Sequence, residues 1–151
     1  TSVNGKFTII DLSTKDILTY SNINSNWIDV DEKNNIVIYG NLNKELGIFC
    51  LKENEINENY IINQDETFKI DPCIIEIDNE FYITYTQIEG TVNNSNIKEK
   101  NGLYTIKMYK SDDLKDWVFV GNIIQENYNL EDVKLYQVEE SIFIIYEKNI
   151  L

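Results

Sequence analysis

Hydrophobic and polar residues alternate with a period of two along most of this 151-residue chain, and short polar segments separate the alternating runs. A period of two places successive side chains on opposite faces of a β-strand, whereas an amphipathic helix repeats every ~3.6 residues. The pattern therefore predicts an all-β fold without a long helix. The expected strands cover residues 6–12, 27–31, 36–42, 46–52, 58–63, 72–77, 81–88, 103–111, 117–124, 133–139 and 141–148.

The composition favours the same fold class. The chain contains no Ala, which is the best helix former, and it contains 25 Ile, 10 Tyr and 6 Phe, which favour strands. The best helix candidate is NNSNIKEKN, residues 93–101 of the polar segment 89–102, but it is polar on all sides and is interpreted as an exposed loop.

The strands recur in groups of four. One group runs from Trp27 to about Asn63 and a second from Asp71 to Ile124, with two strands before them, the first at 6–12, and two after them. Asp29 and Asp71 are 42 residues apart, and 61 residues separate Asp71 from Asp132. Units of four antiparallel strands in about 40–50 residues are typical of β-propeller blades.

We therefore expect an incomplete β-propeller, and the alternative is a β-sandwich with evenly spaced strands. Its units would be a half blade at 1–24, blades at 27–68 and 71–125, and a half blade at 131–151. A closed five-bladed propeller needs about 200–250 residues. The remaining blades would then lie on another segment or in a homo-oligomer, where the terminal strand pairs of two chains complete a blade.

The charged residues exclude several functions. The net charge is −13, and all basic residues are Lys because Arg and His are absent. Such a chain lacks the basic face that nucleic acids and anionic membranes require. It also cannot form a His-based triad, a His-liganded zinc site or a bidentate Arg clamp. We expect no cofactor and no metal.

The two cysteines, Cys50 and Cys73, are too few for a disulfide framework. Each lies in an apolar, strand-like run, so we expect buried thiols in a reducing compartment such as the cytoplasm, although pairing with each other stays open. The chain shows no signal-peptide pattern and no apolar run long enough to cross a bilayer.

Three segments carry a resemblance to a known family. Segment 71–86, DPCIIEIDNEFYITYT, opens with Asp-Pro and continues through an acidic turn into an aromatic strand. Segment 106–123 contains a Tyr-x-Ser-x-Asp-Leu-x-x-Trp pattern, and segment 130–147 begins with Leu-Glu-Asp-Val. Together they resemble the five-bladed propellers of the furanosidase superfamily, which includes invertases, levansucrases, arabinanases and xylosidases.

The resemblance implies glycoside cleavage by paired carboxyl groups at the starts of the innermost strands. It implies Asp29 as nucleophile or base, Asp71 as transition-state stabiliser or pKa modulator, and Glu131 as general acid. Asp31 and Asp132 are the nearest alternatives to the first and last of these. The chain departs from the family because Ile70 stands where invertase-like members carry Arg before the second Asp-Pro.

Three functions therefore stay open: a glycoside hydrolase-like enzyme, a non-catalytic carbohydrate-binding propeller, and a protein-interaction scaffold. Each acid also has a plain interpretation as a turn or solvated residue. Asp113 and Trp117 are interpreted as structural. We expect Asp113 to accept hydrogen bonds from the backbone of its own turn, and Trp117 to be largely buried.

Overall fold

The computed structural model describes residues 6–149 apart from 11–12, 16, 53–54 and 90–101. The described part is all-β, as predicted, and contains no helix that could cross a membrane. The segment expected to form a polar loop lies almost entirely outside the described residues. The strands are β1 Lys6–Ile10, β2 Ile17–Asn24, β3 Trp27–Asp31, β4 Ile36–Gly40, β5 Glu45–Lys52, β6 Glu55–Gln64, β7 Phe68–Ile77, β8 Glu80–Glu89, β9 Leu103–Ser111, β10 Val118–Glu126, β11 Asn129–Val138 and β12 Ser141–Asn149.

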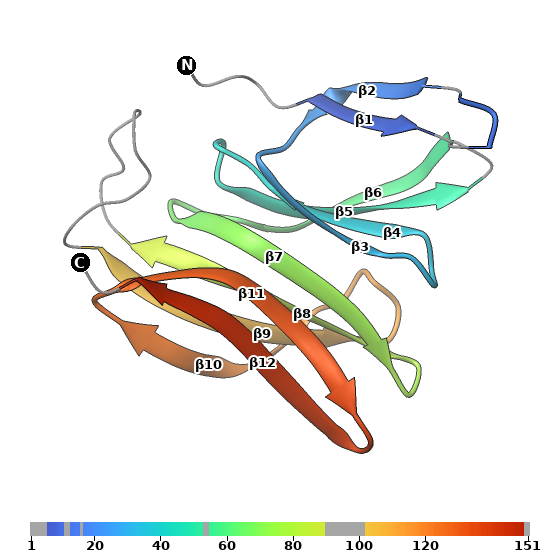
Figure 1. Ribbon diagram of the computed structural model, residues 1–151. Coiled ribbons are helices and arrows are strands. Elements are labelled where there is room, and N and C mark those ends of the chain that lie inside the picture. The colour runs from blue at the N-terminus through green and yellow to red at the C-terminus, as the bar shows by residue number, and fades with distance from the viewer. Residues whose placement is uncertain (1–5, 11–12, 16, 53–54, 90–101, 150–151) are drawn as a thin grey trace.

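The strands form four antiparallel sheets in chain order, which we name A to D (Figure 1). Sheet A contains β1 and β2, and sheet D contains β11 and β12. Sheets B and C each contain four strands, in the orders β3-β4-β5-β6 and β7-β8-β9-β10. The predicted four-stranded antiparallel units are therefore confirmed.

Sheets C and D begin a few residues before the expected blade and half blade. Sheet C begins at Phe68 and sheet D at Asn129, whereas the expected units begin at Asp71 and Glu131. Both acids therefore lie inside a strand. Pro72 is accommodated there because the pairing of β7 with β8 shifts register between Ile70 and Cys73, and proline is tolerated at such a bulge.

Apolar side chains between consecutive sheets form the core. Ile36, Ile38 and Ile48 of sheet B pack against Ile83 and Tyr85 of sheet C. The two other contacts are built in the same way. Sheet A contributes Ile23 against Val37 and Phe49 of sheet B, and sheet D contributes Leu130, Val133 and Leu135 against Ile106 and Met108 of sheet C.

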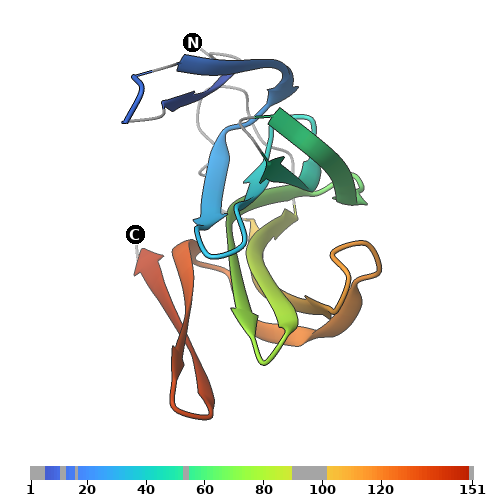
Figure 2. The ribbon, with the colours of Figure 1, turned by 90° about the vertical axis from the view of Figure 1, so that its right-hand side faces the viewer.

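The first strands of sheets B, C and D lie side by side (Figures 1 and 2). We call β3, β7 and β11 the inner strands. We call the fourth strands of sheets B and C, β6 and β10, the outer strands. Three residues connect β6 to inner strand β7, and two residues connect β10 to inner strand β11. β7 contacts both β3 and β11, and residues of all three inner strands line one pocket.

Lys69, a fully buried residue of β7, anchors the loop between β6 and β7. The Lys69 ammonium donates to Asp65 Oδ1 at 2.6 Å and to the carbonyl oxygens of Lys44 and Thr67 at 2.9 and 3.0 Å. Its three donors thus each have a partner, which is what the burial of a charge requires.

The Ser-x-Asp-Leu-x-x-Trp segment forms the turn between β9 and β10. Asp113 Oδ1 accepts hydrogen bonds from the backbone N–H groups of Lys115 and Asp116 at 2.8 and 2.9 Å, which confirms the expected role of this acid. Trp117 is half-buried rather than largely buried. Its indole N–H donates to the Leu114 carbonyl at 3.2 Å, so the ring stays at the margin of the core between sheets B and C.

Candidate functional site

Asp71 on β7 and Asp132 on β11 have the same unusual backbone. Their φ angles are 48° and 54°, in the left-handed region that Asp, Asn and Gly adopt most readily. At each position the pairing with the next strand shifts register, between Ile70 and Cys73 in sheet C and between Glu131 and Lys134 in sheet D. These matching bulges show that Asp71 and Asp132 are equivalent positions of neighbouring sheets.

Side chains of one inner strand accept hydrogen bonds from the backbone of the next inner strand. Asp71 Oδ2 accepts from the Asp132 N–H at 3.0 Å, and Cys73 Sγ accepts from the Leu135 N–H at 3.3 Å. Asp29 Oδ2 accepts from the Ile74 N–H at 3.2 Å. These contacts fix how far each strand is shifted along its neighbour.

The contacts also align β3 with the other inner strands. Asp29 on β3 accepts a hydrogen bond from the N–H of Ile74 on β7, just as Cys73 on β7 accepts one from the N–H of Leu135 on β11. Asp29 therefore occupies the position on β3 that Cys73 occupies on β7. Trp27 lies two residues before Asp29, as Asp71 lies two residues before Cys73, but β3 pairs with β4 without a register shift and has no bulge at this place. Asp29 and Asp71, which are 42 residues apart, are therefore not equivalent positions.

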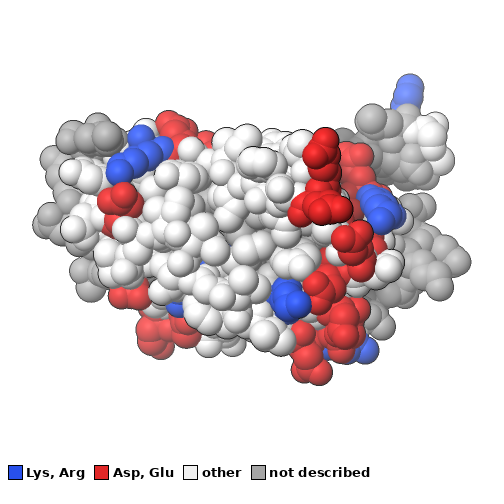
Figure 3. Space-filling model, turned by 90° about the horizontal axis from the view of Figure 1, so that it is seen from below, with Lys and Arg blue, Asp and Glu red and all other residues white. Residues whose placement is uncertain are grey.

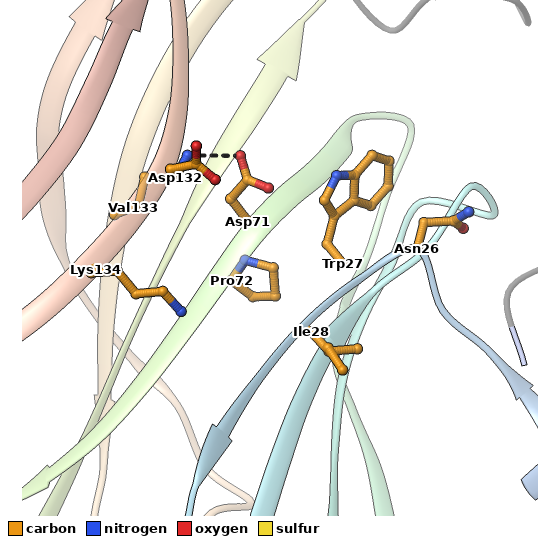
Figure 4. Close-up of a pocket in the computed structure, with 8 residues that line it drawn as sticks. All are labelled: Asn26, Trp27, Ile28, Asp71, Pro72, Asp132, Val133 and Lys134. Carbon is orange, nitrogen blue, oxygen red and sulfur yellow. Dashed lines mark hydrogen bonds between the residues drawn. The ribbon is translucent and has the colours of Figure 1, made fainter. Parts of the chain in front are cut away.

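A pocket of about 260 Å³ lies between the three inner strands (Figure 4). Figure 4 shows the side chains of Trp27 and Asp71 pointing to the same side of their strands, and a dashed line joins Asp71 to Asp132. The residues that line the pocket come from β3, β7, β11 and the residue before β3. They are Asn26, Trp27, Ile28, Asp71, Pro72, Asp132, Val133 and Lys134.

The half-buried carboxyl of Asp71 is the electrostatically unusual group of the pocket. Burial raises its pKa above the ordinary value, and the negative charges of Asp132 and Glu131 raise it further. The hydrogen bond from the Asp132 backbone and the charge of Lys134 lower the pKa, but they do not offset the increase. Asp71 is therefore a carboxyl group that holds its proton more tightly than an exposed aspartate.

A second layer of equivalent residues lies two positions further along the inner strands and consists of Asp29, Cys73 and Lys134. The ammonium of Lys134 forms an ion pair with Asp29 Oδ1. Burial lowers the pKa of Lys134, but the hydrogen bond and charge of Asp29 outweigh burial, so the pKa lies above its ordinary value. Burial, followed by the charge of Asp29, raises the pKa of the Cys73 thiol to about 12.

The three acids named from the sequence thus lie in different places. Asp71 lines the pocket, whereas Asp29 lies in the second layer, held by Lys134 and the Ile74 backbone. Glu131 is half-buried and accepts a hydrogen bond from Asn149 Nδ2 at 3.0 Å, and its neighbour Asp132 lines the pocket instead. Among the residues that the structure describes, no three His, Cys, Asp or Glu are placed to hold a metal ion.

No family model, curated protein or solved structure matches this chain. The pocket combines an indole ring, two carboxyl groups, an amide at Asn26 and one ammonium group.

Trp27 and Lys134 line the pocket but were not predicted as site residues from the sequence. Trp27 could have been identified from its position at the start of an inner strand, but the prediction followed the spacing between acidic residues, which selected Asp29. The signal for Lys134 was its place two residues after Asp132, which matches the place of Cys73 after Asp71.

Proposed function

We propose that the pocket between the inner strands binds a saccharide, and that the chain is part of a propeller-like ring of sheets. One observation carries this proposal: Trp27, Asp71 and Asp132 come from three successive inner strands and line one pocket, and Asp71 and Asp132 lie at matching bulges. An indole ring offers a flat apolar face to the C–H groups of a sugar, while carboxylate oxygens accept hydrogen bonds from its hydroxyl groups. A few convergent polar groups beside an apolar wall are typical of small-molecule sites.

The arrangement of the sheets supports the ring. Each four-stranded sheet begins with an inner strand and ends with an outer strand that leads to the next inner strand. Consecutive sheets pack face to face, as propeller blades do. The resemblance of segment 71–148 to furanosidase propellers points to the same fold and to the same class of ligand.

Binding is favoured over cleavage by the partners of the acids. The family pattern assigns the nucleophile to the position taken here as Asp29, but that carboxylate is neutralised by Lys134 and lies in the second layer. Glu131, assigned as the acid, is hydrogen-bonded to Asn149. The set of three carboxyl groups that the family uses is therefore not gathered around the pocket.

The raised pKa of Asp71 favours one second candidate, acid-assisted glycoside cleavage within the same pocket. A carboxyl group that stays protonated can donate its proton to the leaving glycosidic oxygen. Asp132 would then be the second carboxyl group of the pair. This role differs from the one that the family resemblance gives to Asp71.

Binding and hydrolysis are tested together on a panel of mono- and oligosaccharides, with calorimetry for affinity and aryl furanosides and pyranosides for turnover. Asp71→Asn keeps the oxygen that accepts the Asp132 N–H, and Trp27→Leu removes the aromatic face. Both changes should weaken saccharide binding by at least about tenfold. Asp78→Asn is the matched control, because Asp78 also has a left-handed φ of 52° but lies in the turn between β7 and β8.

Binding that survives both pocket variants would contradict the saccharide site. Turnover that is lost in Asp71→Asn but kept in Asp78→Asn would establish the cleavage candidate. Saccharide binding without turnover would leave the pocket as a binding site alone.

A further inference from the structure

Large apolar side chains are exposed on sheet D and on β3, the inner strand of sheet B. On the outer face of sheet D, Tyr136, Phe143 and Ile145 are 49%, 50% and 59% exposed. On β3, Ile28 and Val30 are 51% and 45% exposed, on the face of sheet B that points away from sheet C. We call these the D face and the β3 face. Figure 3 shows that charge is sparse over the middle of the side of the molecule on which β10 and β12 lie.

Positions equivalent to the D face are covered within the chain. The turns between β7 and β8 and between β11 and β12 each contain two residues. The pairs that flank these turns, Ile77 with Glu80 and Val138 with Ser141, are therefore equivalent. By this alignment Tyr136 and Phe143 are equivalent to Ile75 and Tyr82. Those two residues of sheet C pack against Leu135, Ile142 and Ile144 of sheet D.

Positions equivalent to the β3 face are also covered within the chain. Asp29 is equivalent to Cys73, so Val30 is equivalent to Ile74 and to Leu135. Ile74 and Leu135 are each 5% exposed because the preceding sheet packs on them, whereas Val30 is 45% exposed. The D face and the β3 face are thus the two sides of an inter-sheet contact that the chain already makes twice.

The terminal sheets are complementary halves of a four-stranded sheet. β2 leads into inner strand β3, as β6 leads into β7 and β10 into β11, so sheet A corresponds to the third and fourth strands of a sheet. Sheet D begins with inner strand β11 and corresponds to the first and second strands. In the described part of the chain, β12 and β1 each pair with one neighbour only, which leaves one edge of each open.

We propose that a second copy of this chain occupies these ends. Sheet D of one copy pairs through β12 with β1 of the other copy and completes a four-stranded sheet with its sheet A. The D face then covers Ile28 and Val30 of the second copy, as sheet C and sheet D cover each other within one chain. The contact is heterologous, so the dimer is closed only when sheet D of each copy pairs with sheet A of the other. The closed dimer then contains four four-stranded sheets from within the chains and two four-stranded sheets shared between them.

Strand pairing and apolar burial act together in this junction. An open strand edge accepts another strand through its unpaired N–H and C=O groups. The two apolar faces supply the favourable burial, and the described part of the chain shows no other cover for them. The inference does not rest on saccharide binding, although Ile28 of the β3 face also lines the pocket.

The test is sedimentation velocity and native mass spectrometry of the 151-residue chain over a dilution series. A dimer that dissociates on dilution is expected. Ile145→Lys on the D face and Val30→Lys on the β3 face should each raise its dissociation constant by about 100-fold, because an unpaired charge would be buried in an apolar contact. Val118→Lys is the matched control, because Val118 is 61% exposed on outer strand β10, outside both faces.

A positive test uses one cysteine on each face. Ile145→Cys and Val30→Cys in two different chains should give a disulfide-linked dimer on oxidation when the chains are mixed, and each variant alone should not. A chain that stays monomeric at every concentration overturns the proposal. So does association that Val118→Lys weakens as much as Ile145→Lys does, since the contact would then lie elsewhere.

Discussion

The carboxylate of Asp71 accepts a hydrogen bond from the backbone N–H of Asp132 at 3.0 Å, and both residues have left-handed backbone conformations. The bond joins two inner strands at matching bulges, 61 residues apart in the chain. It fixes the register between sheets C and D and orients the most perturbed carboxyl group of the pocket. One contact therefore serves both the fold and the site, and this relationship leads to the first prediction.

Asp71→Asn should make the protein more stable at neutral pH. Burial and the charges of Asp132 and Glu131 raise the pKa of Asp71 above 3.8, so the folded chain keeps a proton that the unfolded chain has released. Wild-type stability therefore falls as pH rises through that window. The variant cannot ionise, and Asn keeps the acceptor oxygen and tolerates the left-handed backbone.

Thermal unfolding from acidic to neutral pH measures this effect. The melting temperature of Asp71→Asn should exceed that of the wild type at neutral pH, and the difference should vanish below the ordinary pKa of aspartate. Asp78→Asn, in the turn between β7 and β8, is the matched control. A variant that is less stable at neutral pH would mean that the ionised carboxylate is needed for the fold.

Asp113→Ala should lower the melting temperature at neutral pH. The backbone N–H groups of Asp116 and Lys115 hold the pKa of Asp113 below its ordinary value, so the ionised form stabilises the turn. This contribution is present above the ordinary pKa and is lost as pH falls through the folded pKa. The difference from the wild type should shrink in acid, and the exposed neighbour Asp112, changed to Ala, should have little effect.

Thr84→Val and Thr105→Val should change stability in opposite directions. Both threonines are buried in sheet C. The Thr84 hydroxyl has no hydrogen-bond partner among the described residues, whereas Thr105 Oγ1 accepts a hydrogen bond from Gln125 at 3.2 Å. Replacing the unsatisfied hydroxyl should stabilise the protein by about 0.5–1 kcal/mol, and replacing the bonded one should destabilise it by a similar amount.

Chemical denaturation of the two threonine variants gives these free energies of unfolding directly. A loss of stability in Thr84→Val would show that its hydroxyl is bonded in solution, for example through a buried water molecule.

Cys50 should react with a thiol reagent well before Cys73. Cys50 is half-buried, while Cys73 is 3% exposed, and burial with the charge of Asp29 raises its pKa to about 12. Since the thiolate is the reactive form, Cys73 should react only when the chain opens. In Cys50→Ser, labelling should be slow in native buffer and fast in denaturant. Equal rates for the two thiols would contradict the burial of Cys73.

The period of two determined the fold class and the inward faces of the strands. It assigned Ile36 and Ile38 to strands, and the structure buries both between sheets. It also predicted the grouping into four-stranded units, because polar turns interrupt the pattern at regular intervals. The turn formed by Asp113 could be predicted because all its hydrogen bonds are local in sequence.

The sequence could not determine how far the inner strands are shifted along one another. A shift by two residues keeps every side chain on the same face, so the hydrophobic pattern is equally satisfied by Asp29 or Trp27 beside Asp71. The turns concealed the correct alignment, because four residues join β3 to β4 and two join β7 to β8. Only hydrogen bonds between residues far apart in sequence, from Ile74 to Asp29 and from Asp132 to Asp71, decided the register and with it the composition of the pocket.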